Sequence, residues 1–306
     1  MQKIEARSIV QAMSTNRERW KGILFVNIAT LAWATNILIG RTVRNEVGPL
    51  VLTTGRYLVA SFLFFMLLRK RSPAERKVGK DLPLLLGMAI TGVVTFAPLL
   101  YYGLRFTTAV NGTLINGAGP LLTAVFAAIL IHEPFSIRQT VGAVLALGGV
   151  GVLIGGVDLQ ILRTTQWNVG DLWIMLAVVF WALYSVLGRK VMRNRTALSA
   201  TTISMWFGLP ILLMASAFEV YTTPPLWSFR LLGVLVYLGV VPAAIGFLAW
   251  NKGVQILGAG GAMVFYNMLP LYGSLLGILL LREPFTWSHM VGGGCIVAGG
   301  LIAARR

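Results

Sequence analysis

Long uncharged apolar runs dominate this sequence and leave few ways for it to fold. Runs of about 18 or more apolar residues are typical of transmembrane helices, because a helix of about 20 residues spans the hydrocarbon core of a bilayer. Charged residues make up 12% of the chain, against about 25% in soluble domains, and they gather in short segments between the runs. We therefore expect an all-α integral membrane protein that crosses the bilayer several times.

Ten runs are long enough to cross a bilayer. They lie near residues 22–40, 50–68, 82–103, 107–131, 136–156, 170–188, 198–218, 230–250, 257–281 and 286–303. Residues 1–21 are polar and basic, and the run that follows contains Trp33, Thr35 and Asn36 but no clear small-residue cleavage site. We therefore expect this run to be retained as the first helix rather than removed as a signal peptide.

The basic residues are distributed unevenly between the two sides of the predicted membrane protein. With the amino terminus in the cytoplasm, 19 of the 26 Lys and Arg residues fall on the cytoplasmic side and 6 outside, while Arg56 lies within the second run. This asymmetry is the positive-inside rule, and it predicts a multi-pass membrane protein with both termini cytoplasmic. The net charge of +16 then reflects orientation, and we expect no nucleic-acid partner.

One motif occurs twice: Glu133-Pro134-Phe135 returns as Glu283-Pro284-Phe285, 150 residues later. Further matches at offsets of 150 and 148 extend the repeat, among them Pro120 with Pro270, Gly103 with Gly253, Trp33 with Trp181, and Gly40 with Gly188. The predicted organisation is a cytoplasmic segment 1–21, a first repeat 22–156, a loop 157–169, a second repeat 170–303 and a cytoplasmic end 304–306. Each repeat holds five runs, an odd number, so the second copy enters the membrane upside down. Inverted repeats are typical of secondary transporters that alternate access.

Several segments resemble a known family over nearly the whole chain. They are "AWATNILIGR" at 32–41, "GRYLVASFL" at 55–63, "EPFSIRQTVGAVLALGGVGVL" at 133–153, "GDLWIMLAVVFWALYSVLGRK" at 170–190 and "EPFTWSHMVGGGCIVAGGLI" at 283–302. On these residues the chain resembles the drug/metabolite transporter superfamily with two EamA domains, and within it the bacterial exporters of aromatic amino acids. The resemblance implies a basket of ten helices, with helices 1, 3, 4, 6, 8 and 9 around a central cavity and helices 5 and 10 outside.

Motifs for catalysis or ATP use are missing from the sequence. It contains no G-x-x-x-x-G-K-[ST] phosphate loop, no H-E-x-x-H and no G-x-G-x-x-G, so we expect neither an enzyme nor a cofactor. None of the ten acidic residues lies at the centre of a predicted span. Proton relays and sites for organic cations usually need such a carboxylate, which argues against a cation antiporter and leaves no obvious proton carrier.

Polar and aromatic residues cluster on the spans that the family places around the cavity, where amide and phenol groups need partners. The predicted substrate-binding residues are Trp33, Asn36, Tyr102, Asn116, Trp181, Tyr184, Tyr266 and Asn267. Tyr101, Tyr102 and Trp250 lie near span ends, where an interfacial aromatic belt is the alternative. Spans five and ten have small-residue spacings, Gly151-xxx-Gly155 and Gly294-xxx-Ala298, that suit close helix packing.

Pro120 and Pro270 lie near the middle of spans four and nine. Each frees the carbonyl four residues earlier, so both are predicted to bend their helices; the freed carbonyls either contact substrate or are satisfied by neighbouring side chains. For Arg56 we favour snorkelling to the outer interface over a role as a carboxylate anchor. Glu133 and Glu283 are assigned to helix ends, because a proline follows each.

These features, with the resemblance, favour a secondary transporter that exports aromatic and other neutral amino acids across the bacterial inner membrane by alternating access. The alternatives are a carrier for a nucleotide-sugar or phosphorylated sugar, which would want several cavity Lys or Arg residues, and an integral-membrane lipid-group transferase. The expected partners are the small-molecule substrate and membrane lipids, with the protein a monomer.

Overall fold

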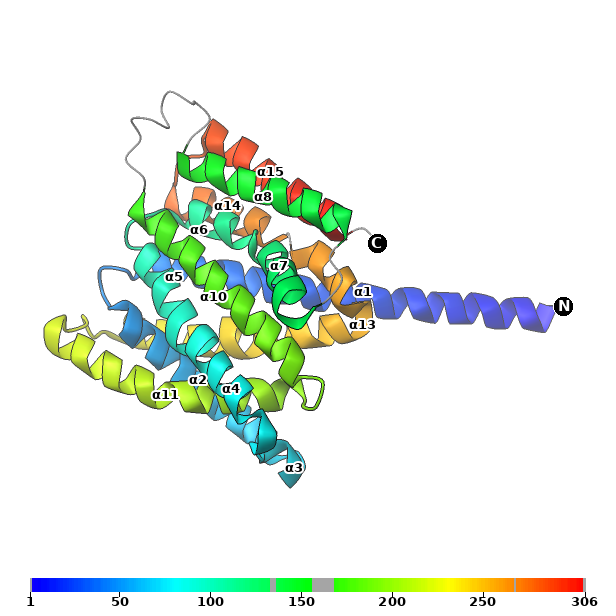
Figure 1. Ribbon diagram of the computed structural model, residues 1–306, viewed down its shortest axis with the longest axis horizontal. Helices are drawn as coiled ribbons and strands as arrows, with labels where there is room; N and C mark the ends of the chain where they lie inside the picture. The colour runs from blue at the N-terminus through cyan, green and yellow to red at the C-terminus, as the bar shows by residue number, and fades with distance from the viewer. Residues whose placement is uncertain (1, 133–135, 156–167, 267, 305–306) are drawn as a thin grey trace.

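A computed structural model describes residues 2–132, 136–155, 168–266 and 268–304, which form helices and no strand within those ranges (Figure 1). Seven helical segments are long and apolar enough to cross a membrane: Arg17–Thr42, Pro49–Arg69, Pro73–Gly103, Ala109–Ile131, Val169–Val191, Ala197–Thr222 and Phe229–Val254. Three shorter apolar helices cover Thr140–Leu153, Met268–Leu281 and Trp287–Ile302. Together these segments correspond in order to the ten predicted spans.

The first repeat contains α1 (Gln2–Thr42), α2 (Pro49–Arg69), α3 (Pro73–Arg76), η1 (Gly79–Asp81), α4 (Leu82–Met88), η2 (Ala89–Phe96), α5 (Ala97–Gly103), α6 (Ala109–Asn116), α7 (Gly119–Ile131) and α8 (Ile137–Gly155). The second contains α10 (Val169–Val191), α11 (Ala197–Thr222), α12 (Phe229–Leu238), η3 (Gly239–Ile245), α13 (Gly246–Tyr266), α14 (Met268–Leu281) and α15 (Trp287–Ala304). The basic segment 2–21 is the first part of α1. Residues 251–256, which separate the predicted spans 230–250 and 257–281, lie within α13.

Side-chain caps explain where several helices begin. Thr108, Asn168, Thr196 and Ser228 each precede a helix and accept a hydrogen bond from a backbone N–H in its first turn. Such a cap satisfies one of the N–H groups that the first turn leaves without a partner. The short polar segments between the apolar runs thus set the start of α6, α10, α11 and α12.

The two repeats share unusual backbone features at equivalent positions. The segments η2 and η3 are π-helical and begin 150 residues apart, at Ala89 and Gly239. His132 and Arg282, also 150 residues apart, both adopt a left-handed conformation with φ 54°, directly before the two Glu-Pro-Phe motifs. The motif therefore follows the same helix end in each repeat. Glu133 lies outside the described residues.

Two pairs of helices related by the repeat pack against each other, α2 against α11 and α8 against α15, and α6 packs against α14. In Figure 1, α8 and α15 lie side by side at one edge of the molecule. A Cβ on Gly149 would lie 2.5 Å from the Gly292 carbonyl oxygen, and one on Gly299 2.4 Å from that of Gly142. Since the partner numbers fall as the residue numbers rise, α8 and α15 are antiparallel and touch through glycine backbones.

The sequence predicted the close contact at Gly151-xxx-Gly155 and Gly294-xxx-Ala298, and the glycines that begin these two spacings do not make it. A Cβ on Gly151 or on Gly294 would meet nothing within 4 Å, so neither glycine makes the contact. A helix places residues two apart on nearly opposite faces, which is why spacing alone selected the wrong pair.

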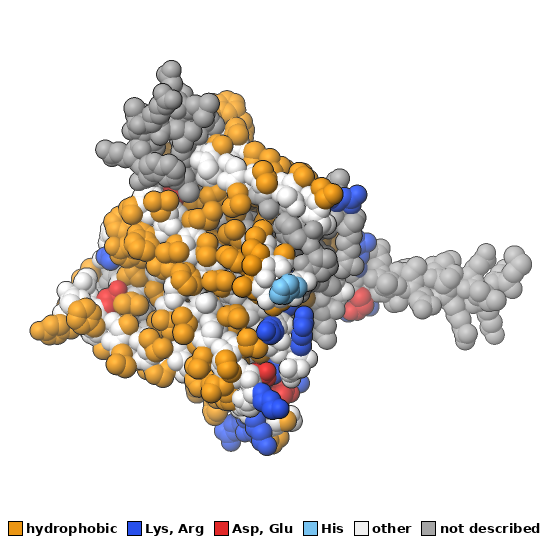
Figure 2. Space-filling view, in the orientation of Figure 1, with side chains coloured by type: hydrophobic (Ala, Val, Ile, Leu, Met, Phe, Trp, Pro, Cys, Tyr) orange, Lys and Arg blue, Asp and Glu red, His pale blue; other side chains and the backbone are white. Residues whose placement is uncertain are grey.

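Apolar side chains cover much of the surface between the two ends of the helices (Figure 2), and several are almost fully exposed, among them Phe229 and Ile137. Such a surface suits lipid rather than water. Lys and Arg side chains gather in Figure 2 near α3, at the end predicted to be cytoplasmic.

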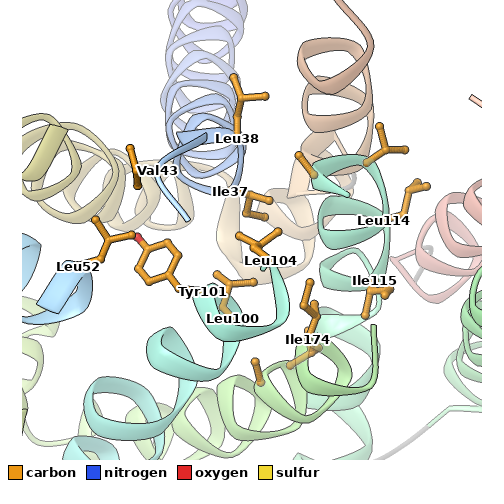
Figure 3. Close-up of a cluster of buried hydrophobic side chains, with 14 of the residues drawn as sticks. Ile37, Leu38, Val43, Leu52, Leu100, Tyr101, Leu104, Leu114, Ile115 and Ile174 are labelled. Carbon is orange, nitrogen blue, oxygen red and sulfur yellow. The ribbon is translucent and has the colours of Figure 1, made fainter. Parts of the chain in front are cut away.

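The largest buried cluster lies at the opposite end. It joins residues at the end of α1 and α5 with residues of α2, α6 and α10, including Ile37, Leu52, Leu104, Leu114 and Ile174 (Figure 3). Leu235 on α12 belongs to the same cluster. Polar contacts reinforce this end: Glu283 accepts the backbone N–H groups of Ala109 and Val110 at 2.9 Å. A carboxylate at a helix N-terminus is favourable, so the helix ends predicted to lie outside are held together.

Candidate functional site

A cavity lies between the two repeats. Its wall includes Trp33, Asn36, Ile37, Arg56, Tyr57, Phe64, Gly92, Val93, Phe96, Leu100, Asn116, Trp181, Tyr184, Thr201, Met205, Pro242, Ala243, Phe247, Tyr266 and Leu269. None of these residues comes from α8 or α15. Both α2 and α11 contribute, although the sequence placed neither helix at the cavity.

The structure brings most of the predicted site residues together. Trp33, Asn36, Asn116, Trp181, Tyr184 and Tyr266 all line the cavity. They come from α1, α6, α10 and α13, so both repeats supply aromatic groups, while both of these amide groups come from the first repeat. Asn267 lies outside the described residues.

Tyr102 does not line the cavity, and its predicted place there is wrong. Its side chain is 39% exposed and packs edge-on against Phe106 and Trp173, with ring centroids 5.3 and 5.4 Å away. Its neighbour Tyr101 is buried instead. Consecutive helix residues point about 100° apart, so these two tyrosines cannot both face inward.

Trp33 lies at the centre of an aromatic cluster. Its ring centroid is 5.5 Å from Trp250, 6.0 Å from Tyr266 and 6.5 Å from Trp181. Its indole N–H donates to the Pro242 carbonyl oxygen at 3.1 Å. This bond satisfies the polar atom of the ring and fixes its orientation, leaving the aromatic faces for packing. Trp250, predicted as a possible interfacial residue, belongs to this cluster.

Trp181 extends the cluster across the cavity. Its ring lies 4.8 Å from Phe96 and stacks on Tyr184 at 5.2 Å. The Tyr184 ring in turn rests on the backbone of Gly92, where a Cβ would lie 2.2 Å from a ring carbon. Gly92 is therefore required here for close approach. Rings from both repeats thus surround one apolar space.

Arg56 forms a polar corner of the cavity and does not snorkel to an interface as predicted. Its side chain is 6% exposed. The guanidinium donates to Asn36 Oδ1 at 2.6 Å, to the Tyr101 hydroxyl at 2.7 Å and to the Tyr57 hydroxyl at 2.8 Å. These three acceptors hold the head group inside the bundle, because moving it outward would break all three hydrogen bonds.

Pro120 marks a break between two helices, which corrects the predicted bend within a continuous helix. α6 ends at Asn116 and Pro120 stands in the first turn of α7. Pro270 lies in α14, and residue 267, between α13 and α14, lies outside the described residues, so the predicted bend at Pro270 stays a prediction. A Cβ on Gly117 would lie 2.7 Å from Pro270 Cγ, so the break before α7 packs against the start of α14. Proline suits a first helical turn because no intrahelical N–H is needed there.

The π-helices were not predicted. η2 supplies Gly92, Val93 and Phe96 to the cavity, and η3 supplies Pro242 and Ala243. π-turns often occur at functional sites because they change the direction of neighbouring side chains. One proline lies near each π-segment, Pro98 just after η2 and Pro242 inside η3. Because proline lacks the N–H that a regular helix needs, these two prolines are the sequence signal that could have located the π-helical segments.

Comparison with known proteins places this architecture among transporters. The family model described as "EamA-like transporter family" matches residues 20–155 and 168–305. The Bacillus subtilis protein "Uncharacterized transporter YyaM" is 29% identical over 251 residues, which is 81% of each chain. A "Probable terminal-alkyne amino-acid exporter" of Streptantibioticus cattleyicolor is 24% identical over 291 residues, 94% of each chain.

A solved structure, titled "Crystal structure of protein", is similar in fold. It superposes with a TM-score of 0.60 at 22% identity, over 95% of this chain and 96% of the other. The two chains therefore share the fold over nearly their whole lengths.

Proposed function

The chain belongs to the EamA-like transporter family, and we propose from that premise that it exports aromatic and other neutral amino acids through its central cavity. Membership of the family implies a multi-pass transporter of small molecules. The solute that we propose is chosen from the side chains that line the cavity.

The main support for an aromatic solute is the set of aromatic rings that both repeats contribute to the cavity wall. Trp33, Trp181, Tyr184 and Tyr266 surround one space, and sites for small molecules are usually lined by apolar and aromatic side chains. Each ring pair adds about 0.5–1.5 kcal/mol beyond area burial. A solute with a ring therefore gains more here than an aliphatic one.

Amide groups on the same wall suit the polar end of an amino acid. Asn36 and Asn116 line the cavity and carry both donors and acceptors. One similar protein is named a probable amino-acid exporter, which supports the same class of solute for this chain.

The unequal packing of the two ends supports alternating access. With both termini in the cytoplasm, the cluster around Ile37, Leu104 and Ile174 would lie on the outer side. Export then requires these helix ends to separate while the opposite ends come together. Inverted repeats provide this exchange, because each half can adopt the conformation of the other.

Transport into proteoliposomes tests the proposal. Purified protein should move labelled phenylalanine, tyrosine or tryptophan, with and without an imposed pH gradient, and should ignore lysine and glutamate. Movement of a phosphorylated sugar or a polyamine without movement of phenylalanine would refute the choice of solute and leave the family assignment intact.

A further inference from the structure

Arg56 is a buried cation that no carboxylate of the described residues neutralises. It lies in α2 within a predicted span, and its side chain is 6% exposed. Among the described residues, no Asp or Glu forms an ion pair with it. Its Nε is buried without a hydrogen-bond partner. A guanidinium stays protonated in proteins, so a full positive charge stands at the cavity wall.

The three partners of Arg56 are neutral groups. The Tyr101 hydroxyl accepts from Arg56 and donates to Asn36 Oδ1 at 2.7 Å, so it keeps its proton. The Tyr57 and Tyr101 rings lie 4.5 and 5.3 Å from the guanidinium carbon. These contacts orient the cation and attract it weakly, but they supply no opposite charge.

A buried charge without a counterion is costly in a membrane protein, and such residues usually face a cavity and mark a solute pathway. Arg56 and its partner Asn36 both line the cavity. Asn36 is three residues after Trp33 on α1, so the two share one helix face. The amide and cation are therefore next to the aromatic cluster.

We infer that Arg56 is the anchor for a carboxylate on the transported solute. This inference rests on the proposed function and narrows it: the solute needs a carboxylate near an aromatic ring, while its ammonium group is dispensable. The guanidinium matches a carboxylate with two parallel N–H donors. The solute thus brings the missing counter-charge and removes it on release.

A purely structural role is the competing explanation, because Arg56 joins α2 to Asn36 on α1 and to Tyr101 on α5. In that case the charge of the solute would not matter. The two explanations differ in which ligands bind, so unmodified protein can distinguish them.

Calorimetric titration of the purified full-length protein with four ligands sharing one ring provides the test. Phenylalanine has both charged groups, 3-phenylpropionate has the carboxylate alone, and phenylalaninamide and phenethylamine have the ammonium alone. We expect the first two to bind and the last two to bind roughly thirtyfold more weakly or worse, since unpairing a buried charge costs at least about that factor.

Variants extend the test. Arg56→Gln should weaken 3-phenylpropionate by a similar factor, and Arg56→Lys should retain part of the affinity because the charge remains. Arg230→Gln is the matched control: it removes one arginine whose side chain is 62% exposed and which pairs with Glu46. It should leave all four affinities unchanged.

Equal binding of phenylalanine and phenylalaninamide by unmodified protein would overturn the anchor while leaving amino-acid transport in place. Binding of 3-phenylpropionate without phenylalanine would support the anchor and refute the amino-acid solute. Absence of binding by all four ligands would overturn both. If Arg56→Gln does not fold, the four ligands on unmodified protein still distinguish a carboxylate anchor from a purely structural role of Arg56.

Discussion

Replacing Trp181 with alanine should weaken transport of aromatic amino acids. Trp181 contacts Trp33, Phe96 and Tyr184, with ring centroids 6.5, 4.8 and 5.2 Å away, and it lines the cavity. A substrate ring that enters this space would pack on at least one of its faces. The substitution therefore removes one ring–ring contact from the bound state.

The expected magnitude follows from that contact. One aromatic pair is worth about 0.5–1.5 kcal/mol beyond area burial, which corresponds to a loss of affinity of about two- to tenfold. The half-saturating concentration of phenylalanine should rise by that factor. Alanine transport should change less, because its side chain has no ring.

The assay is uptake of labelled phenylalanine and labelled alanine into proteoliposomes, at equal amounts of folded protein checked by size exclusion. Trp206→Ala is the matched control. Trp206 is 36% exposed on α11, pairs with Phe65 at 5.7 Å and does not line the cavity. It should leave both uptakes unchanged.

Two results would refute the reasoning. The first is an unchanged half-saturating concentration in Trp181→Ala. The second is an equal loss for phenylalanine and alanine, which would mean that the tryptophan supports the protein rather than the substrate ring.

Four further outcomes are expected. Glu283→Gln should lower the melting temperature, because weakening the charged cap on α6 reduces the free energy of unfolding by about 1–3 kcal/mol. The control Glu46→Gln removes an ion pair to the exposed Arg230 and should reduce it by less than about 1 kcal/mol. Equal shifts in melting temperature would contradict the role of the cap. Gly92→Val should push the Tyr184 ring into the cavity and reduce phenylalanine uptake several-fold, and unchanged uptake would show that the ring moves elsewhere. Pro120→Ala should express normally and slow transport, since it adds a helical N–H at the break between α6 and α7; transport at the unmodified rate would make the break a packing feature. Reporter fusions after residues 75, 160, 193 and 223 should read in, out, in and out, and an outside signal at 193 would refute the predicted orientation.

Features that depend on local chemistry were predictable from the sequence. The ten apolar segments follow from run length, and the repeat follows from matched motifs. The left-handed residues His132 and Arg282 directly precede those motifs, so the prediction of helix ends there is confirmed at Glu283. Four of the aromatic cavity residues were found because deep Trp and Tyr residues are uncommon and need partners.

Features that depend on the rotation of a helix about its own axis were decided by the tertiary structure. Tyr101 is buried while Tyr102 is exposed, and Gly149 touches α15 while Gly151 does not. Arg56 points into the bundle because Asn36, Tyr57 and Tyr101 meet around it from three helices. In a soluble protein, hydrophobic periodicity shows which face of a helix is buried. Here lipid and protein interior are both apolar, so the sequence determines which segments cross the membrane, while packing alone determines which of their side chains face the cavity.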